Sequence, residues 1–187
     1  VKLPGGINTK AEESMPVFSP AGGYFYFSRS LYEGNEGGVK GGQDIWYCEY
    51  ENGKFSNVQN LKALNNISNN AVVGVGDQGN TLYLLNVYKG KGKMKPGISK
   101  VEKEGGSWSG PEEIKIPGLE FEGDFFGLWM NPEGDTMLLS MNGKESSGRE
   151  DLYVCLKKDG KWDKPIHLGE TVNSYGYEMS PFLAKDG

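Results

Sequence analysis

Residues 16–28 read Pro-Val-Phe-Ser-Pro-Ala-Gly-Gly-Tyr-Phe-Tyr-Phe-Ser, so that two largely apolar runs flank a tight glycine turn. Similar segments recur around Gly79 and Gly134, and a fourth one leads up to Gly187. Counted from Gly22, these turn glycines are 57, 55 and 53 residues apart. Short apolar runs on both sides of a glycine turn are typical of β-hairpins. The sequence therefore predicts one hairpin that is used three times and begun a fourth time.

A second block follows each hairpin and repeats with a constant internal spacing. The block starts at Asp44, Gly97 and Asp151. Apolar residues or prolines stand 11, 14 and 17 residues after each start: Phe55, Val58 and Leu61; Trp108, Pro111 and Ile114; Trp162, Pro165 and Leu168. Matched spacings in three copies indicate an internal repeat of about 54 residues.

The repeat predicts an all-β fold, because each unit reads as four short strands separated by turns. Repeated four-stranded units of this length are typical of β-propeller blades. We therefore expect a β-propeller of four-stranded antiparallel blades, with about three full repeats plus flanking strands of another. The expected repeats cover residues of about 9–63, 64–116 and 117–170, and a further repeat starts in 171–187.

The number of repeats raises a question of closure. Propellers close with about four to eight blades, which three repeats and a fraction do not reach. The sequence thus favours a piece of a longer chain that supplies further blades. The alternative is edge-to-edge self-association, in which copies of the chain complete the ring.

The composition excludes several classes of protein. The net charge of −5 argues against nucleic-acid binding, which needs a basic surface. No stretch approaches the roughly 18 consecutive apolar residues of a membrane span. We expect no cofactor, because the only histidine, His167, and two separated cysteines cannot supply a zinc site. Cys48 and Cys155 hold equivalent positions in the first and third repeats, so we expect two buried thiols and no disulfide.

The acidic residues fall into two groups. Glu13 and Glu178 occupy one repeated position, and Asp44 and Asp151 occupy another, so we expect these acids to cap turns by accepting backbone N–H bonds. The acids that do not recur are better candidates for catalysis, although a solvated loop is the favoured interpretation for them: Glu120, Glu122 and Asp124.

Two sets of residues are candidates for binding. Four lysines, Lys89, Lys91, Lys93 and Lys95, stand at alternate positions in the variable segment of the second repeat. They would attract an anionic polymer or an acidic partner, or else form a mobile, solvated loop. Three loop tyrosines could stack on sugar or peptide, or pack locally: Tyr32, Tyr175 and Tyr177.

Three segments resemble a known family: Gly42–Tyr47 reads GQDIWY, Gly160–Asn173 reads GKWDKPIHLGETVN, and Glu178–Gly187 reads EMSPFLAKDG. Together they resemble the WD40-like repeat of TolB-type β-propellers, of the kind found in OmpA-family envelope proteins of the Bacteroidetes. The middle repeat departs from this pattern, because Gly97 replaces the aspartate that opens the second block and no Ser-Pro precedes Gly79.

The resemblance implies a location in the bacterial periplasm or at the outer membrane. It implies a non-catalytic binding or scaffold module that recognises a protein or glycan partner of the cell envelope through variable loops between strands. The alternative is a propeller-type glycoside hydrolase, or the propeller part of a peptidase similar to prolyl oligopeptidase.

Overall fold

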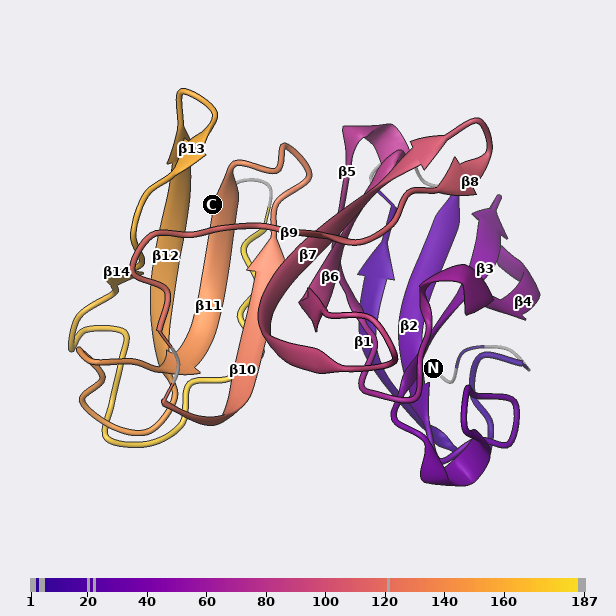
Figure 1. The fold of residues 1–187 in the computed structure, drawn as a ribbon, viewed down its shortest axis with the longest axis horizontal. Coiled ribbons are helices and arrows are strands. Elements are labelled where there is room, and N and C mark those ends of the chain that lie inside the picture. Colours follow the sequence, from indigo (N-terminus) through magenta and orange to yellow (C-terminus); the bar gives the residue numbers. More distant parts are fainter. Residues whose placement is uncertain (1–2, 4–5, 20, 22, 121, 185–187) are drawn as a thin grey trace. The chain divides into compact units, whose positions relative to one another are not determined.

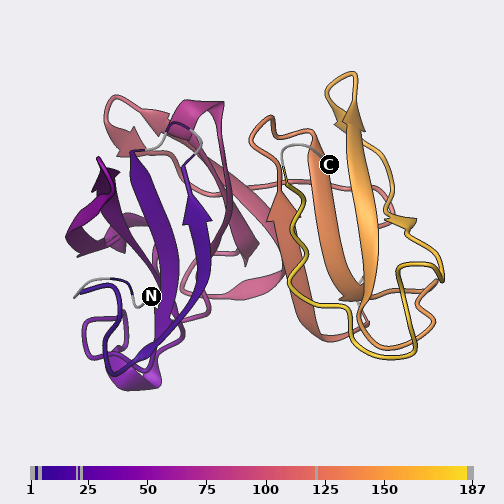
Figure 2. The same cartoon turned by 180° about the vertical axis from the view of Figure 1, so that it is seen from behind.

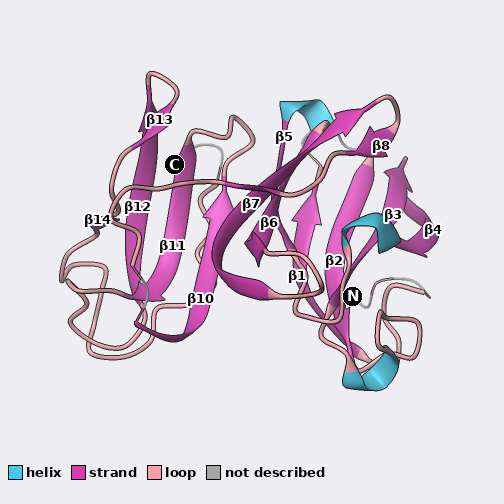
Figure 3. Ribbon diagram, viewed as in Figure 1, coloured by secondary structure: helices cyan, strands magenta, loops and turns pink. Residues whose placement is uncertain are grey.

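The computed structural model describes residues 3, 6–19, 21, 23–120 and 122–184 (Figure 1). The fold is all-β, and its strands form three antiparallel sheets linked by turns and short 3-10 segments (Figure 3). The chain divides into two compact units, Val1–Glu113 and Ile114–Gly187. Within the described part of the chain, no helix is long and apolar enough to cross a membrane. The expected turn residues Gly22 and Gly187 lie outside the described residues.

The first sheet contains β1 (Glu12–Phe18), β2 (Tyr24–Ser30), β3 (Asp44–Glu51) and β4 (Lys54–Asn60), in that spatial order. The five central residues of β2 are buried, which suits a central strand covered on both faces. The edge strand β1 begins earlier than the expected residue 16. It shifts register between Ser14 and Val17, where Pro16 lacks a backbone N–H for the ladder.

The second sheet belongs to the same unit and contains β5 (Val72–Gly76), β6 (Thr81–Tyr88), β7 (Met94–Glu104) and β8 (Ser107–Trp108). The short strand β9 (Glu112–Glu113) also pairs with β7. One hydrophobic cluster joins the first two sheets, and its buried members come from both sheets and from the 3-10 segment Lys62–Leu64: Tyr26, Ile45, Leu64, Val72, Val75, Leu82, Leu84 and Val101.

The third sheet makes up the second unit with β10 (Glu122–Met130), β11 (Thr136–Asn142) and β12 (Asp151–Lys158), seen from behind in Figure 2. Two short outer strands, β13 (Lys161–Trp162) and β14 (Ile166–His167), both pair with β12. Residues 171–184 form turns and irregular structure beside this sheet. They are attached through the Glu178 N–H, which donates to the Glu150 carbonyl at 2.8 Å.

The outer strand differs between the repeats for a simple reason. The sequence predicts one continuous strand at this position in each repeat, and β4 fulfils that prediction. In the other two sheets the outer strand is split, into β8 and β9 and into β13 and β14. Pro111 and Pro165 stand between the two pieces, where Val58 stands in β4. A proline cannot donate to the ladder, so pairing stops on either side of it.

Both cysteines have the predicted environment. Cys48 in β3 and Cys155 in β12 are free thiols with no exposed surface. Burial raises the pKa of Cys48 to about 11 and that of Cys155 to about 12. Both therefore remain protonated and act as small apolar side chains at neutral pH.

Among the residues that the structure describes, Arg29 in β2 is the largest fully buried side chain, with 1% exposure. Its Nε atom lies 3.0 Å from Glu13 Oε1, and its Nη2 atom donates to the Ile7 carbonyl at 2.9 Å. The guanidinium carbon lies 4.3 Å from the ring centroid of Trp46 and 4.7 Å from that of Tyr32. This one side chain thus joins the segment before β1 to the first sheet.

Replacing Arg29 by alanine should strongly destabilise the first unit. The change removes the positive partner of the Glu13 carboxylate and a donor to the Ile7 carbonyl, and breaking a buried ion pair typically costs about 3–5 kcal/mol. Urea denaturation measures the effect. Lys100→Ala, which removes a partly exposed pair with Glu102, is the matched control and should shift the midpoint little. Equal shifts in the two variants would contradict this role of Arg29.

Candidate functional site

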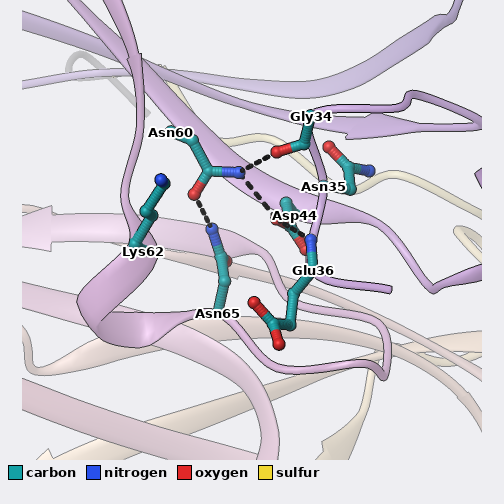
Figure 4. Close-up of a pocket in the computed structure, with 7 residues that line it drawn as sticks. All are labelled: Gly34, Asn35, Glu36, Asp44, Asn60, Lys62 and Asn65. Atoms are coloured by element: carbon teal, nitrogen blue, oxygen red, sulfur yellow. Dashed lines mark hydrogen bonds between the residues drawn. The ribbon is translucent and has the colours of Figure 1, made fainter. Parts of the chain in front are cut away.

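Asp44 organises a polar cluster at the beginning of β3. The residue is fully buried, and its Oδ2 atom accepts hydrogen bonds from the Glu36 backbone N–H at 2.9 Å and from Asn60 Nδ2 at 2.7 Å (Figure 4). Glu36 lies in the loop before β3 and Asn60 ends β4. The expectation that this repeated aspartate caps a turn is confirmed, and the aspartate also holds the outer strand.

Asn65 extends the cluster along the backbone of β3. Its Oδ1 atom accepts from the Ile45 N–H at 2.8 Å, and its Nδ2 atom donates to the Ile45 carbonyl at 2.9 Å. The same Nδ2 atom donates to Asn60 Oδ1 at 2.9 Å. The side-chain amide thus pairs the Ile45 N–H at the end of the sheet and adds a second hydrogen bond to the Ile45 carbonyl, which also accepts from the Leu61 N–H at 2.9 Å.

A cavity of about 150 Å³ adjoins this cluster. Its lining is shown in Figure 4: Gly34, Asn35, Glu36, Asp44, Asn60, Lys62 and Asn65. Burial raises the pKa of Asp44, and the nearby Glu36 charge adds to the rise, whereas the bonds from Asn60 and the Glu36 N–H oppose it. The exposed ends of Glu36 and Lys62 supply the remaining charge. Such a lining suits water or a small polar group rather than an apolar ligand.

The third sheet repeats the cluster with one substitution. Asp151 Oδ2 accepts from the Ser147 N–H at 2.8 Å and lies 2.8 Å from His167 Nε2. Asn173 binds the backbone N–H and carbonyl of Leu152 at 2.8 and 3.0 Å, as Asn65 binds Ile45. His167 Nδ1 accepts from the Gly169 N–H at 3.2 Å, and Nε2 lies 2.8 Å from both Asp151 Oδ2 and Asn173 Nδ2. In the tautomer that carries its proton on Nε2, the ring donates to Asp151. His167 therefore takes the place of Asn60.

The middle repeat exchanges the charges. Gly97 stands at the aspartate position, and Glu113 stands 16 residues later, at the position of Asn60. The Glu113 carboxylate lies 2.6 Å from Lys95 Nζ and 3.1 Å from Lys89 Nζ. The carboxylate has thus moved from the third strand of the repeat to the outer strand, and the donors come from the β6–β7 hairpin. Spacing alone could have located Glu113, although it does not indicate the lysine partners.

The four candidate lysines separate into two pairs. The Lys89 N–H donates to the Lys93 carbonyl at 2.9 Å, which closes a tight turn, and β7 already begins at Met94. The expected loop is therefore wrong for Lys95, which lies in a strand. Lys91 and Lys93 are exposed at the tip, and neither pairs with a carboxylate of the described residues.

The candidate tyrosines have different environments. Tyr32 is half-buried and contacts Trp46 edge-on, with ring centroids 5.4 Å apart, so local packing accounts for it. Tyr175 and Tyr177 are 91% and 62% exposed. They lie in the segment beside the third sheet with four further exposed apolar residues: Val172, Met179, Phe182 and Leu183.

The other acidic candidates accept hydrogen bonds, form a surface ion pair or are exposed. Glu13 Oε1 accepts from Thr9 Oγ1 at 2.6 Å, and Glu178 Oε1 accepts from Ser174 Oγ at 2.5 Å, so the repeated glutamates share one turn-capping role. Glu120 pairs with Lys144 at 2.6 Å at the surface. Glu122 is exposed, and the side chain of Asp124 lies outside the described residues. Among the residues with described positions, no three acidic, histidine or cysteine side chains form a group suited to a metal ion.

No protein-family model, no curated protein and no solved structure matches this chain.

The equivalence of His167 and Asn60 can be tested by exchanging them. His167→Asn should keep a donor to Asp151 and leave stability close to that of the unaltered chain. His167→Ala removes the donor, and leaving a buried acceptor short of a partner costs about 1–3 kcal/mol. Thermal unfolding of both variants gives the comparison. If His167→Asn were as unstable as His167→Ala, the imidazole ring would have a role that an amide cannot fill.

Proposed function

We propose that the three sheets are consecutive blades of a β-propeller that acts as a non-catalytic binding or scaffold module. Three observations support the architecture. Each sheet is a meander in chain order, each lies in one copy of the sequence repeat, and the first and third carry the same capping network. Such a module would present a rigid frame on which loops of different length carry the specificity.

The observation that carries this function is that the repeated polar residues hold the backbone of the first and third sheets together. The repeated acids hold backbone groups of the loop before the third strand, and the repeated amides hold backbone groups of the third strand itself. The segments that differ between repeats join the second strand to the third: residues 31–43, 89–93 and 143–150. A constant frame with variable connections is typical of a recognition surface built on repeats.

The proposed partner is a protein or glycan of the bacterial cell envelope, in the periplasm or at the outer membrane. The resemblance to envelope propellers supports this placement. The exposed charges of Lys91 and Lys93, at the tip of the β6–β7 hairpin, favour a partner with negative charge, in an otherwise acidic chain. Lys89 and Lys95 are held by Glu113 and would mainly shape the hairpin.

Binding to an anionic polysaccharide tests this proposal. We expect the chain to bind polygalacturonate in calorimetric titrations at low salt, and the Lys91→Ala/Lys93→Ala variant to bind several-fold more weakly, because two attractive charges are lost. The control is Lys54→Ala/Lys161→Ala, which removes two exposed lysines elsewhere. Equal binding by both variants would contradict a role for the hairpin tip, and no binding by the unaltered chain would contradict an anionic glycan partner.

The segment after the third sheet supports the proposed continuation of the propeller. Ser140 in β11 donates to the Glu178 carbonyl, as Ser28 in β2 donates to the Asn70 carbonyl just before β5. Residues 178–184 therefore take the place beside the third sheet that β5 takes beside the first. β5 is buried and pairs with β6, whereas Tyr177 and Phe182 are exposed. Further repeats of a longer chain, or a second copy, would cover this surface.

Native mass spectrometry of the 187-residue chain tests whether a second copy of the chain covers this surface. If copies complete the ring, the chain by itself should form dimers or larger assemblies, because apolar surface is buried on association. Tyr177→Ser/Phe182→Ser should then shift the distribution toward the monomer. A stable monomer across micromolar concentrations would contradict ring completion by copies and leave further repeats as the source of the missing strands.

A further inference from the structure

Three buried oxygen atoms in the first unit have no hydrogen-bond partner among the described residues: Asp44 Oδ1, Asn70 Oδ1 and Tyr88 Oη. Asp44 and Asn70 have no exposed surface. A buried polar atom without a partner costs about 1–3 kcal/mol, so several such atoms in one region indicate a bound group that satisfies them.

The backbone brings these residues to one seam between the first two sheets. The Asn70 N–H donates to the carbonyl of Gln43, the residue before Asp44, at 2.8 Å. The Leu85 N–H of β6 donates to the Ala71 carbonyl at 3.0 Å, so Asn70 lies between the start of β3 and the second half of β6. Tyr88 ends β6 and packs against the hydrophobic cluster that contains Ile45, the residue after Asp44.

The orientation of each polar group is fixed by its other contacts. Asn70 Nδ2 donates to the carbonyls of Asn66 and Ser68, both at 2.8 Å, so Oδ1 is the free end of the amide. The Glu36 N–H and Asn60 Nδ2 both donate to Asp44 Oδ2, so Oδ1, on the other side of the carboxylate, is the oxygen without a donor among the described residues. Burial raises the pKa of the Tyr88 hydroxyl, and the Asp44 charge raises it further, which supports a close approach of the two groups.

The chemistry of the three atoms identifies the ligand. Asp44 Oδ1 and Asn70 Oδ1 are acceptors, and Tyr88 Oη is a donor at neutral pH. A water molecule has two protons to donate and lone pairs to accept a third bond, so one molecule satisfies all three. A direct bond from Tyr88 to Asp44 would leave Asn70 Oδ1 unpaired.

We propose that Asp44, Asn70 and Tyr88 bind one buried water molecule that links β3, the segment before β5 and the end of β6. The water fixes the first sheet to the second at the edge where the polar cluster lies. Buried waters with about three hydrogen bonds to internal polar groups are regular parts of globular structures. Asp151 Oδ1 is likewise buried and unpartnered among the described residues, which places the same requirement on the equivalent position of the third sheet.

A crystal structure of the unaltered chain, at a resolution that shows ordered solvent, tests the proposal directly. We expect one solvent peak within hydrogen-bond distance of Asp44 Oδ1, Asn70 Oδ1 and Tyr88 Oη. A direct bond between Tyr88 and Asp44 with no peak would overturn the proposal. A peak at about 2.3–2.6 Å from the oxygens would also overturn it, since such distances indicate a cation such as calcium.

Nuclear magnetic resonance gives an independent reading on the same protein in solution. A bound water should produce cross-relaxation between long-lived water and the ring protons of Tyr88. Tyr47 is the matched control, because its hydroxyl bonds the Gln59 side chain in an exposed position and should show only fast-exchanging solvent. If Tyr88 behaved like Tyr47, no long-lived water would occupy the seam.

Discussion

A buried carboxylate at the beginning of the third strand determines how each complete polar cluster is built. Asp44 and Asp151 have no contact with solvent, so each needs donors from the protein to offset the loss of hydration. The donors come from the loop that precedes the strand and from the last residue of the outer strand. One charge therefore specifies the end of a loop, the start of one strand and the end of another.

The middle repeat shows that the requirement is for donors to one carboxylate rather than for a particular residue type. With Gly97 in place of the aspartate, the outer strand carries the carboxylate of Glu113, and the hairpin supplies lysines in place of backbone N–H groups. This version is more exposed than the other two, and an exposed ion pair contributes less than a buried hydrogen-bonded charge. Lys89 and Lys95 thereby become part of the frame, whereas Lys91 and Lys93 remain exposed at the tip of the β6–β7 hairpin.

The sequence predicted the number of sheets and most of their strands, because turn glycines and apolar runs mark each hairpin. It also predicted free, buried cysteines from their equivalent positions. It did not predict the split outer strands, although Pro111 and Pro165 carry the reason. The candidate site was harder to predict from the sequence. In the middle repeat the carboxylate is that of Glu113 on the outer strand rather than one at the position of Asp44, and this change depends on which side chains meet across strands. The half-buried position of Tyr32 against Arg29 was also not predicted, because no local pattern revealed that Arg29 is buried.

The continuity of β4 has a consequence for self-association. Prolines shorten the outer strands of the second and third sheets, which removes the row of free backbone groups that could pair with another molecule. β4 has seven residues and no proline, so this edge must be protected by other means. Its protection comes from Asn57, whose positive φ of 53° coincides with a register shift against β3, and from its polar side chains. A substitution that straightened β4 and made it apolar would turn the rim of the first sheet into a template for fibrous aggregation.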